Sequence, residues 1–566
     1  MKGILLFVTV LFWNYSIAQN SAIPHLEKKG SKMQLVVNDQ SFLILSGELH
    51  NSSAGSTQYM RSIWPRMANQ SLNTVIAPIS WELIEPKEGA FDFSLVDSMV
   101  IGARKENLRL VILWFGSWKN GKSSYVPDWV KNDTKRFPLV QNKDGKRMDV
   151  LSTLYSKSLD ADAAAFAELM KYIKKIDSKD HTVIMVQVEN EVGILGSIRD
   201  FNETANHAFS GQVPSELVNY LEKNKFGLYP ALAKVWAANG YKQKGTWEEV
   251  FGKGVEYTGE DWKTNFSYYT EEIFMAWNYA KYIGEIAKKG KGQYPLPMFA
   301  NAWLKQPHSK NPGQFPSGGP LPQVIDIWRA AAPAIDFIAP DIYIVEEFDW
   351  VCQEFTRSGN PLFIPETKVG PDGSARAFYA FGKYNAMGYA PFGIDGGWIF
   401  NSADPKDESL KKVYGCLKNI APLVQENRGT DNMSALFISE GGQGDKLEMG
   451  DYTVSIRRFS AANLFKSTGG RFGVEGVEDK SAVGIIVIKL QDNEFLVAGG
   501  IGGTIVNISK GISNKFENVG YASVDEISYE NGKMLSHRLN GDQTAMGAAV
   551  IKPGEVKIFK IKMYGY

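Results

Sequence analysis

Eight strand-like runs alternate with helix-like stretches over the first two thirds of the chain, and this alternation constrains the fold most strongly. Each run is short and dominated by β-branched, aliphatic or aromatic residues, as in strands buried in a parallel sheet. Strands and helices that alternate eight times over roughly 350 residues predict a (β/α)8 TIM barrel, an α/β fold. The runs cover residues 42–50, 73–81, 109–116, 182–191, 297–303, 336–343, 361–367 and 389–395, and helical patterns lie at 57–70, 95–107, 161–175, 269–289, 324–332 and 376–387.

The strand-like runs end in polar or aromatic side chains. In a barrel the carboxyl ends of all strands meet at one face, where active sites lie. The sequence therefore predicts a polar pocket with aromatic walls on that face. The residues at or just beyond these ends are Glu48, His50, Trp81, Trp114, Trp118, Asn190, Glu191, Asn301, Trp303, Asp341, Tyr343, Glu366 and Asp395.

Two carboxyl groups stand out, because Glu191 ends the fourth run and Glu366 ends the seventh. An ionised carboxylate taken out of water costs several kcal/mol unless it is paired. Hydrolysis of a glycosidic bond needs one carboxylic acid to protonate the leaving oxygen and one carboxylate to attack the anomeric carbon. We expect Glu191 to be the acid/base, held protonated by burial and by the charge of Glu366, and Glu366 to be the nucleophile. The alternative is a structural buried pair.

Other strand-end residues are candidates for sugar contacts. Asn190 is placed to bond a sugar hydroxyl next to the reaction centre, and Tyr343 to hydrogen-bond the nucleophile. A satisfied core histidine is the alternative for His50, and core packing is the alternative for the tryptophans, which include Trp398. The substrate-binding candidates are Asn190, Glu48, His50, Trp81, Trp118, Lys119, Asn120, Asn301, Trp303, Tyr343 and Asp395.

Several classes of partner are disfavoured by composition. The 62 basic and 62 acidic residues cancel, and a nucleic-acid binder would need a basic surface. The 6 histidines show no metal-ligand spacing, so we predict neither a metal nor a cofactor. The 2 cysteines, Cys352 and Cys416, are too few for a disulfide framework, and a buried free thiol is the expected state of Cys416.

The hydrophobic pattern of the sequence changes after about residue 427, where helical periods give way to short alternating or apolar runs. Turns rich in Gly, Asn and Asp separate these runs, so we predict a smaller C-terminal antiparallel β-sandwich domain. Its expected role is to pack against the barrel, with carbohydrate binding as the alternative. The predicted domains are a signal peptide over 1–18, a barrel over 19–426 and the sandwich over 427–566; the sandwich runs are 452–459, 484–489, 494–498, 503–508, 548–551 and 556–563.

The first residues predict a cleaved signal peptide. Lys2 supplies a positive start, residues 4–13 form a short apolar stretch, and Ser16-Ile17-Ala18 fits a small-x-small cleavage site. No later segment approaches 18 uninterrupted apolar residues, the length that would predict a membrane span. We therefore expect an exported protein, periplasmic or extracellular, that is cleaved near Ala18.

Three segments resemble glycoside hydrolase family 35, a family of β-galactosidases in a clan of retaining barrel glycosidases. Val186-Gln-Val-Glu-Asn-Glu191-Val-Gly193 resembles the acid/base strand of that family. The segment from Trp81 to Phe93 is similar to the clan's second-strand motif, and Ser46-Gly47-Glu48-Leu49-His50 to the family's first-strand Ser-Gly-x-x-His. The resemblance covers roughly residues 36 to 425. It implies catalytic carboxylates on strands four and seven, and it suggests the bacterial branch in which a compact β domain follows the barrel.

The chain departs from the family pattern at the galactose-recognition segments. Residues 50–53 read His-Asn-Ser-Ser where the family has His-Tyr-x-Arg, and no Cys-Ala-Glu segment follows the third strand. The nucleophile segment reads Pro-Glu-Thr at Glu366 in place of the common Ser-Glu-Phe. The resemblance thus extends to the catalytic pair but not to the family's galactose-recognition residues. In their place we expect sugar contacts from Glu48, His50, Trp118, Lys119 and Asn120.

The resemblance and the paired carboxylates together predict an exported, retaining exo-β-galactosidase. Family and export suggest plant cell-wall side chains, such as those of xyloglucan, as substrates. The altered loops leave two alternatives: the same mechanism on a β-glucoside, β-mannoside or α-L-arabinofuranoside, and a barrel that binds carbohydrate without cleaving it. For partners we expect the carbohydrate, no nucleic acid and no membrane insertion, with a homodimer as one alternative to a monomer.

Overall fold

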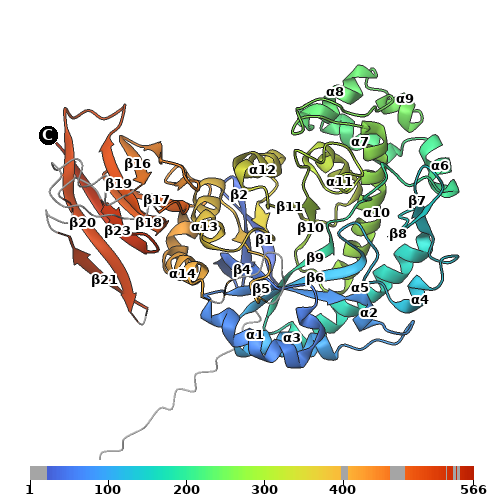
Figure 1. Cartoon of the computed structure of the whole chain (residues 1–566), viewed down its shortest axis with the longest axis horizontal. Helices are drawn as coiled ribbons and strands as arrows, with labels where there is room; N and C mark the ends of the chain where they lie inside the picture. Colours follow the sequence, from blue (N-terminus) through green and yellow to red (C-terminus); the bar gives the residue numbers. More distant parts are fainter. Residues whose placement is uncertain are drawn as a thin grey trace, which may run out of the picture.

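The computed structural model describes residues 22–396, 404, 406–458, 479–530, 532–539, 544 and 549–566. The predicted signal peptide and Trp398 lie outside these residues. A barrel and a β-sandwich lie side by side, and the sandwich is at the left of Figure 1. Among the helices of the described part, none is long and apolar enough to cross a membrane.

The eight predicted barrel strands are all present, and they run in one parallel sheet (Figure 1). Its order is β11-β10-β9-β6-β5-β4-β13-β12, and a bridge between Ile342 and Thr367 brings the two edges together. The (β/α)8 prediction is confirmed. The strands are β4 (Ile44–Glu48), β5 (Thr74–Ser80), β6 (Arg109–Lys119), β9 (Val183–Asn190), β10 (Met298–Trp303), β11 (Phe337–Asp341), β12 (Phe363–Ile364) and β13 (Gly388–Tyr389).

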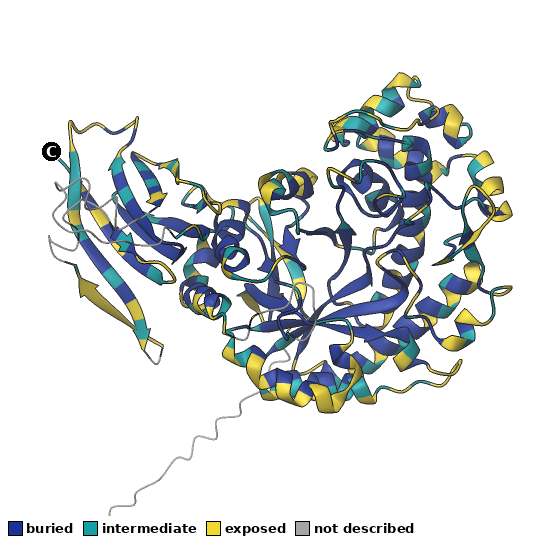
Figure 2. Ribbon diagram, viewed as in Figure 1, coloured by how far each residue is buried: buried dark blue, intermediate teal, exposed yellow. Residues whose placement is uncertain are grey.

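Amphipathic helices cover the outside of the barrel. In α1 (Thr57–Asn69) the buried residues Met60, Ile63, Trp64 and Met67 recur at intervals of three and four, so they share one face. Figure 2 shows the result, with buried strands inside and helices whose outer faces are exposed. The other large helices around the barrel are α3 (Ser94–Lys105), α5 (Ser156–Asp177), α10 (Tyr269–Gln293), α11 (Ile325–Ala331), α12 (Phe348–Phe355), α13 (Pro371–Tyr384) and α14 (Ser409–Asn427).

The long segment after β9 forms a helical insertion on one side of the barrel, at the upper right of Figure 1. Its last short helix begins with a capping box, in which Thr246 and Glu249 satisfy each other's backbone N–H groups. The insertion contains α6 (Glu203–Ser210), α7 (Ser215–Lys223), α8 (Pro230–Ala238) and α9 (Trp247–Phe251). The remaining short helices are α2 (Trp81–Ile84), α4 (Asp128–Lys131) and the 3-10 turns η1 (Ser53–Gly55), η2 (Pro322–Val324), η3 (Val345–Glu347) and η4 (Arg357–Gly359).

Two small sheets were not predicted from the sequence. An N-terminal sheet of β1 (His25–Lys29), β2 (Lys32–Val37) and β3 (Gln40–Phe42) packs on the barrel. Its Leu35 and Val37 join the barrel's own Ile44, Phe299 and Phe337 in one apolar cluster, so this sheet closes the amino-terminal end of the barrel. The second sheet is the hairpin of β7 (Leu139–Gln141) and β8 (Arg147–Leu151).

The C-terminal region is an antiparallel β-sandwich, as predicted. A six-stranded sheet in the order β14-β17-β18-β23-β20-β21 faces a four-stranded sheet in the order β15-β16-β19-β22, and both contribute to one apolar core. Four of the strands, β14, β15, β20 and β21, have no counterpart among the predicted runs. The strands are β14 (Met433–Ile438), β15 (Gly444–Met449), β16 (Tyr452–Arg458), β17 (Val483–Gln491), β18 (Glu494–Ile501), β19 (Thr504–Lys510), β20 (Val519–Glu530), β21 (Lys533–Arg538), β22 (Ala549–Ile551) and β23 (Val556–Gly565).

The outer face of the six-stranded sheet packs against α13 and α14 of the barrel. Ala435 and Ile486 of the sheet belong to the same apolar cluster as the barrel core. Glycines allow the close approach: a Cβ added at Gly484 would lie 2.0 Å from the carbonyl oxygen of Ala375 in α13, and one at Gly382 would lie 2.7 Å from the side chain of Ala435. The barrel and the sandwich therefore share a continuous apolar interface.

Candidate active site

A cavity of about 990 Å³ opens at the carboxyl ends of the barrel strands. That volume is at the upper end of the range for small-molecule sites. Its inner end carries Lys119, Glu191, Asp341, Tyr343 and Glu366, and its mouth is lined by hydroxyl, amide and aromatic side chains. Seven of the predicted site residues line it, namely His50, Lys119, Asn120, Glu191, Trp303, Tyr343 and Glu366.

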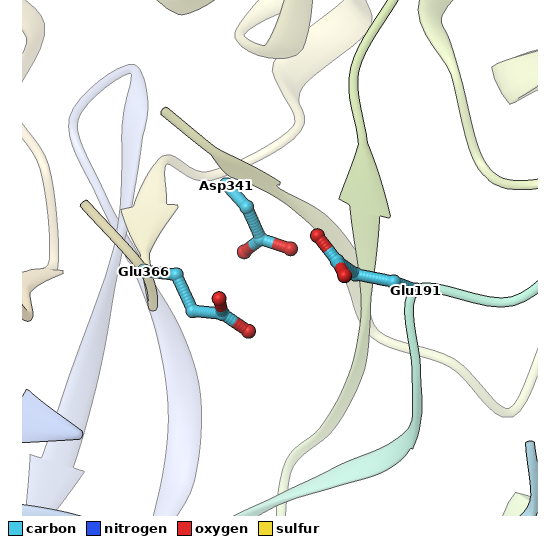
Figure 3. Close-up of side chains that lie close together, drawn as sticks. All are labelled: Glu191, Asp341 and Glu366. Carbon is cyan, nitrogen blue, oxygen red and sulfur yellow. The ribbon is translucent and has the colours of Figure 1, made fainter. Parts of the chain in front are cut away.

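Three carboxyl groups meet at the inner end of the cavity. Figure 3 shows Glu191 after β9, Asp341 at the end of β11 and Glu366 after β12, with their carboxyl groups turned toward one another. One oxygen of each lies within 4.8 Å of one oxygen of each other. In retaining glycosidases the two catalytic carboxyls are about 5–5.5 Å apart, whereas inverting enzymes separate them by about 6.5–9.5 Å. The close approach of Glu191 and Glu366 is compatible with the shorter of these two separations.

The backbone at the end of β9 is held in an unusual conformation. Glu189 and Glu191 both have positive φ, 63° and 45°, which costs about 1 kcal/mol or more for each non-glycine residue. The carboxylate of Glu189 accepts hydrogen bonds from the backbone N–H of Ser117 at 3.0 Å and of Trp118 at 2.7 Å. The N–H of Glu191 donates to Asn301 Oδ1 at 2.9 Å. These bonds hold Asn190 and Glu191 in place.

The carboxyl group of Glu191 is buried and is held in its protonated form. Burial and the nearby charge of Glu366 raise the pKa of Glu191 to about 8, and the ammonium of Lys119 opposes this shift. The carboxyl of Asp341 is 3% exposed and accepts a hydrogen bond from Asn301 Nδ2 at 2.7 Å. Burial, together with Glu366, Glu191 and Glu48, raises the pKa of Asp341 well above its usual value.

Glu366 accepts two hydrogen bonds from side chains. The phenol of Tyr343 donates to Oε2 at 2.9 Å, and Asn190 Nδ2 donates to Oε1 at 3.2 Å. Burial, and then the charge of Glu366, raises the pKa of Tyr343, so its phenol stays a donor. The two donors fix both oxygens of this carboxylate and stabilise its negative charge.

His50 is oriented from behind by Asp395. Asp395 Oδ1 accepts from His50 Nδ1 at 2.9 Å and from the backbone N–H of His50 at 3.1 Å, and Oδ2 accepts from Ser53 Oγ at 2.5 Å. The other ring nitrogen, Nε2, has no hydrogen-bond partner among the described residues, and His50 lines the cavity. Nε2 itself is buried, so the bonds to Asp395 fix the position of the ring at the cavity wall.

Two predicted sugar contacts are wrong, because the side chains point away from the cavity. Trp81 is fully buried, and its Nε1 donates to Glu85 Oε2 at 2.7 Å. Trp118 is also fully buried; its Nε1 donates to the carbonyl of Leu151 at 3.1 Å, and its ring packs on Tyr279. Neither ring offers a face to a sugar, so both are core residues.

Four further predicted contacts lie behind the cavity wall and act on other side chains. Asn190, Asn301 and Asp395 hold Glu366, Glu191 and His50 as described above. Glu48 is fully buried, and both of its carboxyl oxygens lack a hydrogen-bond partner in the described part of the chain. Burial, and then the charge of Glu366, raises the pKa of Glu48 well above its usual value.

Asp341 was noted as a strand end but was not among the predicted site residues. Its position at the end of the sixth barrel strand was the available signal. Glu191, Asp341 and Glu366 are also the set that could share a metal ion within the described residues. Metal ligands must be deprotonated, so a metal ion at this position would compete with the proton that burial keeps on Glu191.

The fold and the arrangement of the carboxyl groups are similar to those of barrel glycoside hydrolases. A family model described as glycosyl hydrolases family 35 matches residues 34–288. The resemblance predicted from the sequence is therefore confirmed. A second model, described as a domain of unknown function (DUF5597), matches residues 410–551, which begin inside α14 and include most of the described sandwich strands.

Known proteins with a similar sequence or fold include several β-galactosidases. Beta-galactosidase 13 of Arabidopsis thaliana is 27% identical over 203 residues, which are 33% of this chain and 22% of that protein. The chain thus aligns with about a fifth of the length of this curated relative. Among solved structures, a β-galactosidase from Bacillus circulans sp. alkalophilus is 10% identical with a TM-score of 0.50, covering 92% of this chain and 99% of its own. Gan42B, a family 42 β-galactosidase of G. stearothermophilus, is 11% identical with a TM-score of 0.52 and covers 95% and 100%. These structures share the fold.

Proposed function

We propose that the protein is an exported, retaining exo-β-galactosidase that removes terminal β-galactosyl units from oligo- or polysaccharides. The observation that carries the proposal is the pair formed by Glu191 and Glu366, whose carboxyl oxygens lie within 4.8 Å of each other at the inner end of the cavity. The match to family 35 and the name of the Arabidopsis relative support the choice of sugar. The enzyme class requires a carbohydrate substrate.

In the first step, an oxygen of the Glu366 carboxylate attacks the anomeric carbon while the bond from that carbon to the leaving oxygen breaks. Glu191 transfers its proton to the leaving oxygen, so the aglycone departs as a neutral alcohol. Glu191 is then ionised, and Glu366 carries the sugar as an ester. The raised pKa of Glu191, about 8, keeps the proton available for this step at neutral pH.

In the second step, the ionised Glu191 takes a proton from water as the water oxygen attacks the same carbon. The ester bond breaks and Glu366 leaves as a carboxylate, so both catalytic groups return to their starting state. Two displacements at one carbon retain its configuration. Tyr343 and Asn190 stabilise the charge of Glu366 whenever it is free, through the bonds of 2.9 and 3.2 Å.

The cavity supports an oligosaccharide with a neutral terminal sugar. Its lining includes three carboxyl groups, Glu191, Asp341 and Glu366, and one cation, Lys119, among the described residues, so it offers little to bind an acidic sugar. Its outer part includes Tyr59, Tyr125 and Trp303. Aromatic side chains combine a large apolar face with a polar edge, which suits further sugar rings beyond the cleaved bond. A branched plant cell-wall polysaccharide such as xyloglucan is the proposed source of that substrate.

A second candidate is the same mechanism on another sugar, such as a β-glucoside, β-mannoside or α-L-arabinofuranoside. The observation that favours it is the set of cavity residues at which this chain departs from family 35, which includes Asn51, Ser53 and Lys119. A barrel that only binds carbohydrate is disfavoured, because it would have no need for buried catalytic carboxyls.

Location and assembly are also proposals. Residues 1–18 have the pattern of a cleaved signal peptide, which supports export to the periplasm or the extracellular space. The division into a barrel domain over 19–426 and a sandwich domain over 427–566 is proposed from the change in sequence texture. Light scattering of the purified protein would distinguish a homodimer from a monomer.

The test is hydrolysis of a panel of aryl glycosides by the mature protein, with Glu366→Ala assayed alongside. Release from the β-galactoside, lost in the variant, supports the proposal, and turnover of a β-galactosylated xyloglucan oligosaccharide supports the proposed substrate. If the aryl group is released only from a different glycoside, the proposed mechanism stands and the proposed specificity for galactose is rejected. Undiminished turnover by Glu366→Ala rejects the catalytic assignment.

A further inference from the structure

Lys119 is a buried cation next to the proposed catalytic pair. It lies at the end of β6, is 7% exposed and lines the cavity. Its Nζ donates to Asn190 Oδ1 at 2.5 Å, and it lies 5.1 Å from the centre of the Phe115 ring. The sequence predicted that Lys119 contacts the sugar, but in the described part of the chain its side chain donates a hydrogen bond to Asn190.

The bond from Lys119 decides how the Asn190 amide is oriented. An amide offers an acceptor oxygen on one side and an NH2 donor on the other. Because Lys119 has only donors, it selects the oxygen of Asn190, and the NH2 group is then left to face Glu366. The observed distance from Asn190 Nδ2 to Glu366 Oε1 is 3.2 Å. The three side chains form one relay from ammonium to amide to carboxylate.

We propose that Lys119 is a positioning residue for Glu366, acting through Asn190, and that it tunes the charge of the site instead of recognising the sugar. The inference rests on the proposed function. It explains how a lysine fits at the inner end of the pocket, where the family's third-strand segment is absent. A charge-assisted hydrogen bond is about twice as strong as a neutral one, so this contact fixes Asn190 firmly.

The same cation acts on Glu191. Lys119 of β6, Glu48 of β4, Asp341 of β11 and Glu366 after β12 all face Glu191, and Lys119 is the one cation in this group within the described residues. A nearby positive charge favours the ionised form of a carboxyl group. Removal of Lys119 therefore raises the pKa of Glu191 further and moves the basic limb of the pH profile to higher pH.

The first test compares Lys119→Met with Lys122→Met, which removes an exposed lysine of the same turn. We expect Lys119→Met to lower kcat on an aryl β-galactoside by about 10- to 100-fold, to change KM less than about threefold, and to move the basic limb up by about one pH unit. Lys122→Met should match the parent protein. A raised KM with unchanged kcat and an unmoved basic limb would show a sugar contact and overturn the inference.

The second test is a double-mutant cycle with Asn190→Ala. If Lys119 acts through Asn190, the double variant should lose no more kcat than Asn190→Ala alone. Losses that multiply would overturn the relay. If the melting temperature shows that Lys119→Met does not fold, Lys119→Gln replaces it in the double-mutant cycle and in the pH profile. Lys119→Gln keeps a hydrogen-bond donor but removes the charge. A parent protein that cleaves no glycoside would reject the proposed function itself, whereas an active parent with the contrary pattern in the variants rejects the role of Lys119.

Discussion

An oxygen of Glu191 lies within 4.8 Å of an oxygen of Glu366, although 175 residues separate them along the chain. The two side chains come from opposite parts of the sheet order, after β9 and after β12, and the closed barrel brings them together. Burial and the charge of Glu366 raise the pKa of Glu191 to about 8, so Glu191 holds its proton near neutral pH. Two carboxyl groups in different states are what a double displacement requires.

Removal of the proton donor should affect substrates according to their leaving group. We predict that Glu191→Gln lowers kcat/KM by about 10³-fold or more on a galactoside with a poor leaving group. The loss should be far smaller on a dinitrophenyl galactoside, whose leaving group needs no proton. The pKa of Glu191, about 8, predicts a basic limb near pH 8 for the parent protein, and this limb should be absent in the variant. Equal losses on both substrates would contradict the acid role.

Glu191 should also make stability depend on pH. Its pKa is raised from about 4.5 in the unfolded chain to about 8 in the folded protein, so the folded state holds the proton more tightly. Stability from this group is complete below pH 4.5 and is lost as pH rises toward 8. Glu191→Gln should therefore have a higher free energy of unfolding than the parent at pH 8, by roughly 1–4 kcal/mol, with little difference at pH 4.5. Melting temperatures at both pH values check this.

The hydrogen bond from His50 to Asp395 should control the position of the His50 ring at the cavity wall. In Asp395→Asn the side-chain amide can donate as well as accept, so the tautomer of His50 is no longer fixed. We predict an increase in KM of about tenfold with a smaller change in kcat. Ser53→Ala removes a bond to the same carboxylate but leaves its charge, so its effect should be smaller. Equal kinetics for Asp395→Asn and the parent would argue against a sugar contact at His50.

The close packing of the sandwich on the barrel predicts a sensitive glycine. A Cβ at Gly484 would approach the carbonyl oxygen of Ala375 to 2.0 Å, so Gly484→Ala should force β17 and α13 apart. We expect a loss of about 2–3 kcal/mol in the free energy of unfolding, measured by thermal melts. Gly292, in the last turn of α10, has no atom within 4 Å of an added Cβ, so Gly292→Ala is the matched control and should be neutral or slightly stabilising.

Most of the fold could be predicted because the barrel strands are buried and therefore read as apolar runs. All eight appear, even β12 and β13, which are only two residues long as hydrogen-bonded strands. The N-terminal sheet was missed because every residue of β1 except Leu26 is charged or polar, and this pattern resembles a loop. Its apolar partner β2 is short and lies before the first barrel strand, where no repeat signals it.

The sequence predicted the site residues whose place depends only on where a strand ends. It did not predict the direction in which a side chain points. The strand β6 continues three residues beyond its predicted end, and its pairing with β9 is irregular between Trp114 and Lys119. This irregularity turns Trp118 into the core and Lys119 into the cavity. Trp81 is the first residue of the helix α2, and its ring is buried there. Neither direction can be read from spacing, since a shift of one residue exchanges the two faces of a strand.

The most direct test of the central claim is to trap the covalent intermediate. The mature protein is incubated with an activated 2-deoxy-2-fluoro-β-galactoside, which slows the second step more than the first, and is then digested and examined by mass spectrometry. We predict one fluorinated galactosyl group per chain, on the peptide that contains Glu366, and none on Glu366→Gln. A label on Asp341 or any other residue, or turnover of the β-galactoside with inversion and no label, would contradict the account.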